Sequence, residues 1–535
     1  NPLNSPSDQT FLATETEMQM ALASCYTALW TDFETMTFFL SFDEAADIGY
    51  DRNTSALQTM AQGAADANSD LAKNYWKAFY AGIAKCNYLL QNMSRGEDNV
   101  SPVTYTQIKA EAQFLRALYY SYLIELYGDV PLITDVLTLE TGQQPRNPKS
   151  EVVDFILKEY TEAAENLPST NNPTSGHATK GAALALKART ALYNERWQDA
   201  ISASQAVMAM EGTEYIIEDD YSKLFKYEGQ TSKEVIFSVQ YLLGTKVHAL
   251  YRLFGSRNAL AHTNKKPAYQ LADTWECIDG KQIDESPMFD PKNPYENRDP
   301  RLGYTLAVSG SEFLGFQFET HGDSTQCWNY MTNQRVDNLE ATHAYATFTG
   351  ICWRKYANIE DKDALNDCDM NTILIRYPEV LLTYAEAKIK AGEIDASVLE
   401  AINKVRQRPS VKMPPITTTD PNELFYAVAR ERKYEFSGEG LRLFDIRRWK
   451  IAETVMNQPL LGRMKKSYPD KAPRIDEWGT AFYEGIPIAE SGESADFKMR
   501  IVDIRKFDKN RDYLWPIPYI ERQTNPNLTQ NPNYE

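Results

Sequence analysis

The 535-residue sequence has no long hydrophobic run: none approaches the roughly 18 apolar residues that a membrane-spanning helix needs. Its first thirty residues also lack the charged and apolar regions of a signal peptide. These two absences leave two alternatives open. The protein is cytosolic, or its targeting segment was removed before residue 1.

The sequence also has no excess of positive charge. Its 56 Lys and Arg residues are outnumbered by 74 Asp and Glu residues, which gives a formal net charge of −18. A surface of that sign repels phosphate backbones and anionic lipid headgroups, and no basic cluster interrupts it along the chain. We therefore expect no nucleic-acid partner.

Cysteine and histidine are scarce and show no pattern. The six cysteines form no CxxC pair and have no zinc-like spacing with the five histidines, so we expect no metal and no cofactor. They are also too sparse for a disulfide framework. One bridge among the four later cysteines stays open; these are Cys277, Cys327, Cys352 and Cys368.

Catalytic motifs are missing as well: there is no GxSxG, HExxH or P-loop. The stretch "RERKYEFSGEGLRLFDIRRW" holds enough carboxylates to suggest a glycosidase pair. However, Glu431 and Glu435 lie one helical turn apart, and Arg432, Arg442, Arg447 and Arg448 are close enough to pair with them. Guanidinium partners keep carboxylates ionised, which makes poor general acids. We expect a structural salt-bridge cluster and no enzyme, with a glycosidase as the weaker alternative.

What the sequence does contain, in its first half, is helical periodicity. In residues 101–127 apolar side chains recur every three or four positions, with Ser101 and Pro102 as start signals and Gly128 as a stop. A second helix follows from residue 150, with Ser150 as its expected cap. Residues 178–210 then show alanine-rich spacing, a short turn and a second helix, the pattern of a tetratricopeptide hairpin. Such hairpins bury their faces only by stacking on neighbours.

Between about Tyr241 and Met370 the helical pattern fades, and Gly, Asn, Asp and aromatic residues increase. Long irregular segments inside a folded protein are usually functional. Sugars need exposed aromatic platforms beside hydrogen-bonding groups. Two stretches offer both: "CWNYMTNQR" with Trp328, Asn329 and Tyr330, and "GYDRN" with Tyr50, Asp51, Arg52 and Asn53. The alternative, that Trp328 and Tyr330 only fill a small satellite core, is equally compatible with the sequence.

Six stretches, in order along the whole chain, resemble the RagB/SusD family of outer-membrane nutrient-binding lipoproteins. They are "SPSDQTFLATETEMQMALASCYTALW", "AEAQFLRALYYSYLIELYGDVPLI", "NPYENRDPRL", "RYPEVLLTYAEAKIKAGE", "ERKYEFSGEGLRLFDIRRW" and "YLWPIPYIERQTNPNLTQNPNY". The stretch between Gly310 and Thr347 follows no family pattern.

The resemblance implies a mainly α fold: a single body (1–535) with a right-handed tetratricopeptide-like scaffold (10–240 and 372–455). A loop-rich ligand-binding part with a few short strands (241–371 and 456–510) would lie on it. It also implies a non-catalytic protein that binds an oligosaccharide, or in some branches a peptide, and passes it to a SusC-like TonB-dependent transporter. A lipid anchor upstream of residue 1 would hold it on the outer surface of the outer membrane. The site would form where residues 50–53 meet residues 328–330.

The last segment (511–535) combines an apolar run with asparagine–proline turns. Composition alone predicts disorder for its end, whereas the resemblance implies a docked segment. We expect Leu514, Trp515 and Ile517 to be buried against the helical body, since their apolar surface is costly to leave in water.

Overall fold

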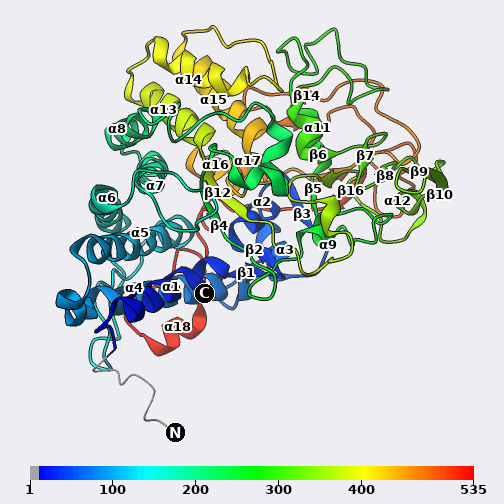
Figure 1. Cartoon of the computed structure of the whole chain (residues 1–535). Helices are drawn as coiled ribbons and strands as arrows, with labels where there is room; N and C mark the ends of the chain where they lie inside the picture. Colours follow the sequence, from blue (N-terminus) through cyan, green and yellow to red (C-terminus); the bar gives the residue numbers. More distant parts are fainter. Residues whose placement is uncertain (1–10, 535) are drawn as a thin grey trace.

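Stacked helices form one side of the molecule, and short strands and loops form the other (Figure 1). The computed structural model describes residues 11–534; the beginning of the first family-like stretch and Glu535 lie outside them. Within the described residues, nine helices have eleven or more residues. They are α1 (Glu15–Tyr26), α4 (Asp70–Asn92), α5 (Pro102–Tyr127), α6 (Lys149–Asn166), α7 (Lys180–Tyr193), α8 (Trp197–Met208), α13 (Tyr377–Ala391), α14 (Ala396–Arg406) and α15 (Pro421–Phe436).

The predicted N-terminal cap is correct for α5 and wrong for α6. α5 begins as expected, because the Ser101 hydroxyl accepts the Thr104 N–H at 3.1 Å. The expected cap at Ser150 is wrong: α6 begins one residue earlier, and no side chain caps it from the preceding position. Instead the Asp129 carboxylate, from the end of the previous helix–turn, accepts the Lys149 N–H at 2.7 Å.

The long helices pack in chain order, so that α4, α5, α6, α7 and α8 form a ladder and α13 and α14 extend it (Figure 1). The small residues predicted for the hairpin face are buried, including Ala182, Ala185 and Ala188 in α7. The mainly α fold that the resemblance implies is thus confirmed. Most of the core lies between these helices and the strands beside them.

The other side of the molecule consists of short antiparallel pairs. A four-stranded sheet has the order β10–β9–β8–β7, and six two-stranded pairs complete the set within residues 11–534. The strands are β1 (Asp32–Phe33), β2 (Met36–Thr37), β3 (Gly49–Asp51), β4 (Val235–Val239), β5 (Lys265–Pro267), β6 (Leu306–Ala307), β7 (Glu312–Phe313), β8 (Phe316–Gln317), β9 (Gln326–Asn329), β10 (Gln334–Asp337), β11 (Cys352–Trp353), β12 (Thr372–Arg376), β13 (Leu460–Gly462), β14 (Arg474–Ile475), β15 (Ala481–Phe482) and β16 (Arg500–Asp503).

The remaining helices of the described residues are short. They are α2 (Ser41–Glu44), α3 (Ala56–Ala61), α9 (Leu250–Phe254), α10 (Tyr269–Thr274), α11 (Arg301–Thr305), α12 (Leu339–Thr342), α16 (Arg442–Arg448), α17 (Ala452–Val455) and α18 (Tyr519–Thr524). All six cysteines are buried free thiols, so the bridge left open above is not formed. None of the helices in the described part of the chain is long and apolar enough to cross a membrane.

The C-terminal segment is docked, as expected. Trp515 and Ile517 are fully buried, and the Trp515 N–H donates to the Leu126 carbonyl of α5 at 2.7 Å. The Asn531 side chain holds the turn by donating to the Tyr127 and Trp515 carbonyls. Leu514 is only half-buried, contrary to expectation, because it lies at the wall of an open cleft.

Candidate functional site

Residues Tyr50 and Asp51 lie in β3, which pairs with β5 so that Tyr50 faces Lys266 and Asp51 faces Lys265. Tyr50 is 5% exposed and Asp51 is 1% exposed. The Asp51 carboxylate is occupied by Lys265 Nζ at 2.7 Å and by the Ser55 hydroxyl at 2.6 Å. Both side chains are therefore buried in the strand pair, and their contact with a ligand stays a prediction.

The next two residues reach the surface. Arg52 donates to the Tyr345 carbonyl at 2.7 Å and to Asn264 Oδ1 at 2.9 Å, and its guanidinium lies 5.3 Å from the centre of the Tyr345 ring. Asn53 donates to the Glu34 carboxylate at 3.2 Å. The Tyr345 side chain is 58% exposed, so the ring keeps a face open to solvent while Arg52 holds it in place.

The other predicted group sits at the β9–β10 hairpin. Trp328 is half-buried and lies opposite Arg335 in the strand register, while Tyr330 is 49% exposed. Asn329 is buried, and its Oδ1 accepts the N–H groups of Met331 and Thr332. Its amide oxygen therefore stabilises the hairpin turn.

The structure does not join the two predicted groups directly. In Figure 1 the β9–β10 hairpin lies at the outer edge of the strand-rich side, and β3 lies closer to its centre. In the described part of the chain, no hydrogen bond or ring contact links residues 50–53 to residues 328–330. Residues 343–348 instead lie beside Arg52, which contacts both Tyr345 and Phe348.

Sequence reasoning missed Tyr345 and Phe348. They belong to "THAYATFTG", where aromatic rings alternate with small polar residues as in "CWNYMTNQR". The same composition criterion could therefore have identified this stretch as a candidate binding segment. The stretch starts inside the segment without family resemblance, however, and its proximity to Arg52 depends on the fold.

The electrostatics around Arg52 are dominated by positive charge. Burial lowers the pKa of Lys266 to about 7, and repulsion from Arg52 adds to the effect. Burial and the nearby Arg257 and Arg52 likewise lower the pKa of His343. Burial followed by repulsion from Arg257 also lowers the pKa of Arg52 itself. These cations destabilise one another's charged forms, a situation that a negative group would relieve.

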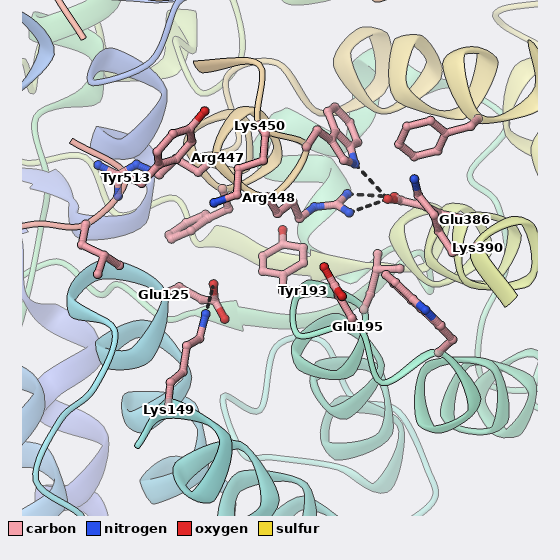
Figure 2. Close-up of a pocket in the computed structure, with 16 residues that line it drawn as sticks. Glu125, Lys149, Tyr193, Glu195, Glu386, Lys390, Arg447, Arg448, Lys450 and Tyr513 are labelled. Atoms are coloured by element: carbon pink, nitrogen blue, oxygen red, sulfur yellow. Dashed lines mark hydrogen bonds and ion pairs between the residues drawn. The ribbon is translucent and has the colours of Figure 1, made fainter. Parts of the chain in front are cut away.

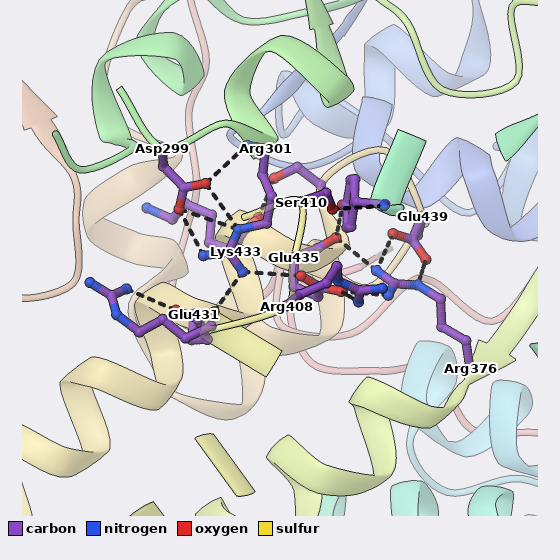
Figure 3. Close-up of polar contacts among 12 residues, drawn as sticks. Asp299, Arg301, Arg376, Arg408, Ser410, Glu431, Lys433, Glu435 and Glu439 are labelled. Carbon is purple, nitrogen blue, oxygen red and sulfur yellow. Dashed lines mark hydrogen bonds and ion pairs between the residues drawn. The ribbon is translucent and has the colours of Figure 1, made fainter. Parts of the chain in front are cut away.

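The carboxylate-rich stretch is a buried ion-pair network (Figure 3). Arg301 pairs with Glu431 at 2.5 Å and with Glu435 at 3.0 Å, and Arg376 pairs with Glu435 at 2.6 Å. Burial alone would raise the pKa of Glu435, but Arg408 and Arg376 outweigh it and hold that pKa well below its usual range. The salt-bridge interpretation is confirmed, and such ionised carboxylates are poor general acids.

The expected arginine partners were nevertheless wrong. Glu431 and Glu435 take their partners from α11, β12 and the end of α14, not from their own stretch. The arginines of that stretch mostly serve other carboxylates: Arg432 pairs with Asp445, Arg442 with Asp47 and Arg448 with Glu386. Sequence proximity could not show these assignments.

A cleft of about 510 Å³ opens on the scaffold side, between the α7–α8 turn, α13, α16 and the C-terminal segment (Figure 2). Arg448 and Trp449 both donate to the Glu386 carboxylate in this cleft, whereas Nε and Nη1 of Arg447 and the Tyr193 hydroxyl are buried without a hydrogen-bond partner. Cations cover two of its rings, with Lys450 Nζ 4.1 Å from the Tyr513 ring centre and Lys390 Nζ 3.5 Å from that of Phe425. No group of three or more His, Cys, Asp or Glu side chains suited to a metal ion occurs in residues 11–534.

A helical ladder that carries a loop-rich side with exposed aromatic residues defines a class of binding proteins. Two family profiles cover most of the chain: one described as "SusD family" matches residues 233–534, and one described as "Starch-binding associating with outer membrane" matches residues 3–192. The chain belongs to the SusD family.

Individual SusD-like relatives are similar to this chain over nearly its full length. SusD-like protein P2 of Formosa agariphila is 24% identical over 563 aligned residues, covering 100% of this chain and 95% of the relative. The crystal structure of a SusD-like carbohydrate binding protein from Bacteroides fragilis superposes with a TM-score of 0.82 at 29% identity, covering 97% and 100% of the two chains. Surface glycan-binding protein A from Bacteroides fluxus shares the fold, with a TM-score of 0.70 at 22% identity over 98% and 100%.

Proposed function

We propose that the protein is a non-catalytic carbohydrate-binding protein that captures an oligosaccharide on the surface around Arg52. The observation that carries this proposal is the exposed Tyr345 ring, which Arg52 holds from its backbone carbonyl and its ring face. A flat, fixed aromatic ring beside hydrogen-bonding groups is what a sugar ring needs for stacking. The name of the Bacteroides fragilis relative, a carbohydrate binding protein, supports the same function.

The predicted residues take different parts in this proposal. Arg52 and Asn53 line the surface, whereas Tyr50 and Asp51 support it from β3. The hairpin residues Trp328 and Tyr330, with Asn329 fixing their turn, are proposed as a second aromatic contact for a longer chain.

A glycan array and a peptide pool, read by calorimetry on the strongest binders, test the function. Replacing Tyr345 by alanine removes the stacking ring, and we expect affinity for the glycan to fall roughly tenfold, the equivalent of about 1.4 kcal/mol. Trp328→Ala should have a smaller effect, limited to longer oligosaccharides.

The matched control is Tyr519→Ala, which removes a tyrosine of similar exposure (47%) from α18 on the scaffold side. It should leave affinity unchanged. Binding of peptides instead of glycans would favour the peptide-binding alternative. A loss confined to Trp328→Ala would move the site to the hairpin, and hydrolysis of the bound glycan would revive the glycosidase alternative.

We further propose that the protein delivers its ligand to a SusC-like TonB-dependent transporter, while a lipid anchor upstream of residue 1 holds it at the cell surface. The support is the family profile described as associating with the outer membrane. Ligand capture and transporter contact would then use different sides, with the helical ladder supplying both rigidity and the contact surface for the transporter.

A further inference from the structure

Five cations gather around the proposed ligand surface without a carboxylate partner. No described Asp or Glu oxygen lies within 4.0 Å of their charged nitrogens, although neighbouring Lys265 pairs with both Glu34 and Asp51. In a chain of net charge −18, five unpaired cations in one place are unusual. They are Arg52, Arg252, Arg257, Lys266 and Arg500.

Three of these cations surround one ring. The charged groups of Arg500, Lys266 and Arg52 lie 4.3, 4.8 and 5.9 Å from the centre of the Phe348 ring. Because the three cations lie around the same ring, their positive charges repel one another. Contact with the aromatic ring stabilises each cation only weakly, so it does not replace an ionic partner.

Lys266 is the clearest sign of a missing partner. Its side chain is fully buried, and its Nζ has no hydrogen-bond acceptor. A buried ammonium group without a partner is costly. Lys265, the adjacent residue in β5, shows what this fold does when a lysine is purely structural, since it meets Glu34 and Asp51 at 2.7 Å each.

The nearby carboxylates already have other hydrogen-bond or ion-pair partners. Glu340 is buried and accepts the backbone N–H groups of Arg257 and Thr347. Glu34 and Asp51 serve Lys265. None of these carboxylates therefore pairs directly with the five cations; Glu340 and Glu34 attract Lys266 and Arg252 only from a longer distance.

We propose that this surface selects oligosaccharides bearing anionic groups, with carboxylate or sulfate oxygens taking the place of the missing partners. The proposal rests on the function given above, and it adds the chemistry of the ligand. Tyr345 supplies the stacking face, while Arg52 and Arg500, 5.9 and 4.3 Å from the centre of the Phe348 ring, contact the negative group. Lys266 supplies additional positive charge from beneath.

Pairs of oligosaccharides that differ only in charge test this proposal. Oligogalacturonate is compared with its methyl ester, and a sulfated oligosaccharide with its desulfated form, on an array that also carries neutral glycans. We expect at least one anionic member to bind about tenfold or more tightly than its neutral form, because a hydrogen bond to a charged group is stronger than one to a neutral group. That affinity should fall with added salt. The pair that shows this difference, carboxylate against methyl ester or sulfate against its desulfated form, identifies which anionic group is bound.

The Arg500→Gln variant should weaken anionic binding about tenfold and leave neutral binding unchanged. Arg474→Gln is the matched control, because Arg474 also lies 4.3 Å from a ring, that of Phe482, but already has Glu484 at 3.4 Å. Thermal melting confirms that both variants fold.

Two results would overturn the inference. If the tightest ligands are neutral and Tyr345→Ala abolishes their binding while Arg500→Gln does not, the protein binds glycans but does not select charge. If no glycan binds at all, the inference and the proposed function both fail.

Discussion

His248 is a buried histidine that should make stability depend on pH. It is 1% exposed; its Nε2 donates to the Met370 carbonyl at 2.9 Å, and its Nδ1 accepts the Leu250 N–H. Burial lowers its pKa from 6.5 to about 4. Below pH 6.5 the unfolded chain therefore takes up a proton that the folded protein refuses, so stability present at pH 7.5 is lost as the pH falls toward 4. The loss from this residue is about 2 kcal/mol at pH 5.

Urea unfolding at pH 7.5 and pH 5 measures this contribution. His248→Gln should reduce the difference between the two pH values by about 2 kcal/mol. His177 is the control, because it is half exposed and its hydrogen bond to Glu111 raises its pKa, the opposite direction. An unchanged pH dependence in His248→Gln would contradict the assignment.

At the scale of single residues, the sequence indicated which segment lies near the proposed surface, but not which of its side chains reach that surface. "GYDRN" does contribute to the proposed surface, but only through Arg52 and Asn53. Tyr50 and Asp51 are covered by β5, more than 200 residues later in the chain, and a three-residue strand has no periodicity that could reveal this. Lys266 and Arg500 were not identifiable for the same reason.

At the scale of elements, the C-terminal segment should contribute strongly to stability. The Trp515 ring packs 5.9 Å from Tyr75, 6.1 Å from Tyr127 and 6.1 Å from Phe42, measured between ring centres. Trp515→Ala would leave a cavity between α4, α5 and α2. We expect it to lower the free energy of unfolding by about 3–5 kcal/mol, measured by chemical denaturation.

Ile520→Ala, in the same segment, is the comparison. Its side chain is 50% exposed, so the change should stay within about 0.5 kcal/mol. Equal effects of the two substitutions would mean that the segment contributes little to the core.

Elements with many residues could be predicted, and short ones could not. The bounds of α5 follow from its cap, its periodicity and Gly128, which has a φ of 76°. Strands of two to five residues leave too few positions for an alternating pattern. The loop-rich side was accordingly recognised by composition, but its strand pairs and their register were not.

At the scale of the whole molecule, we expect the natural protein to fractionate with the outer membrane. After mild detergent extraction it should copurify with a TonB-dependent transporter, because the proposed delivery requires a lasting contact. Arg500→Gln should copurify equally well, since the change lies on the strand-rich side, away from the helical ladder (Figure 1). Recovery of the protein alone under the same conditions would count against the transporter contact.

The whole-molecule charge shows the limit of composition. A net charge of −18 correctly indicates an acidic protein, yet the fold gathers Arg52, Arg257 and Arg500 around the buried Lys266 in one positive region. These residues come from four separate segments, so no run of basic residues marks them. The family and fold class were evident from motifs spread over the chain, whereas the ligand surface depends on contacts between distant segments.

The docking of the last segment has a consequence for the order of events during synthesis. Tyr75 and Tyr127, in α4 and α5, leave the ribosome early, but the Trp515 ring that completes their packing leaves it near the end. Until then the N-terminal helices have an unfilled groove where Trp515 and Ile517 will sit. The packing of α4 and α5 is therefore completed only after the last segment of the chain has been synthesised.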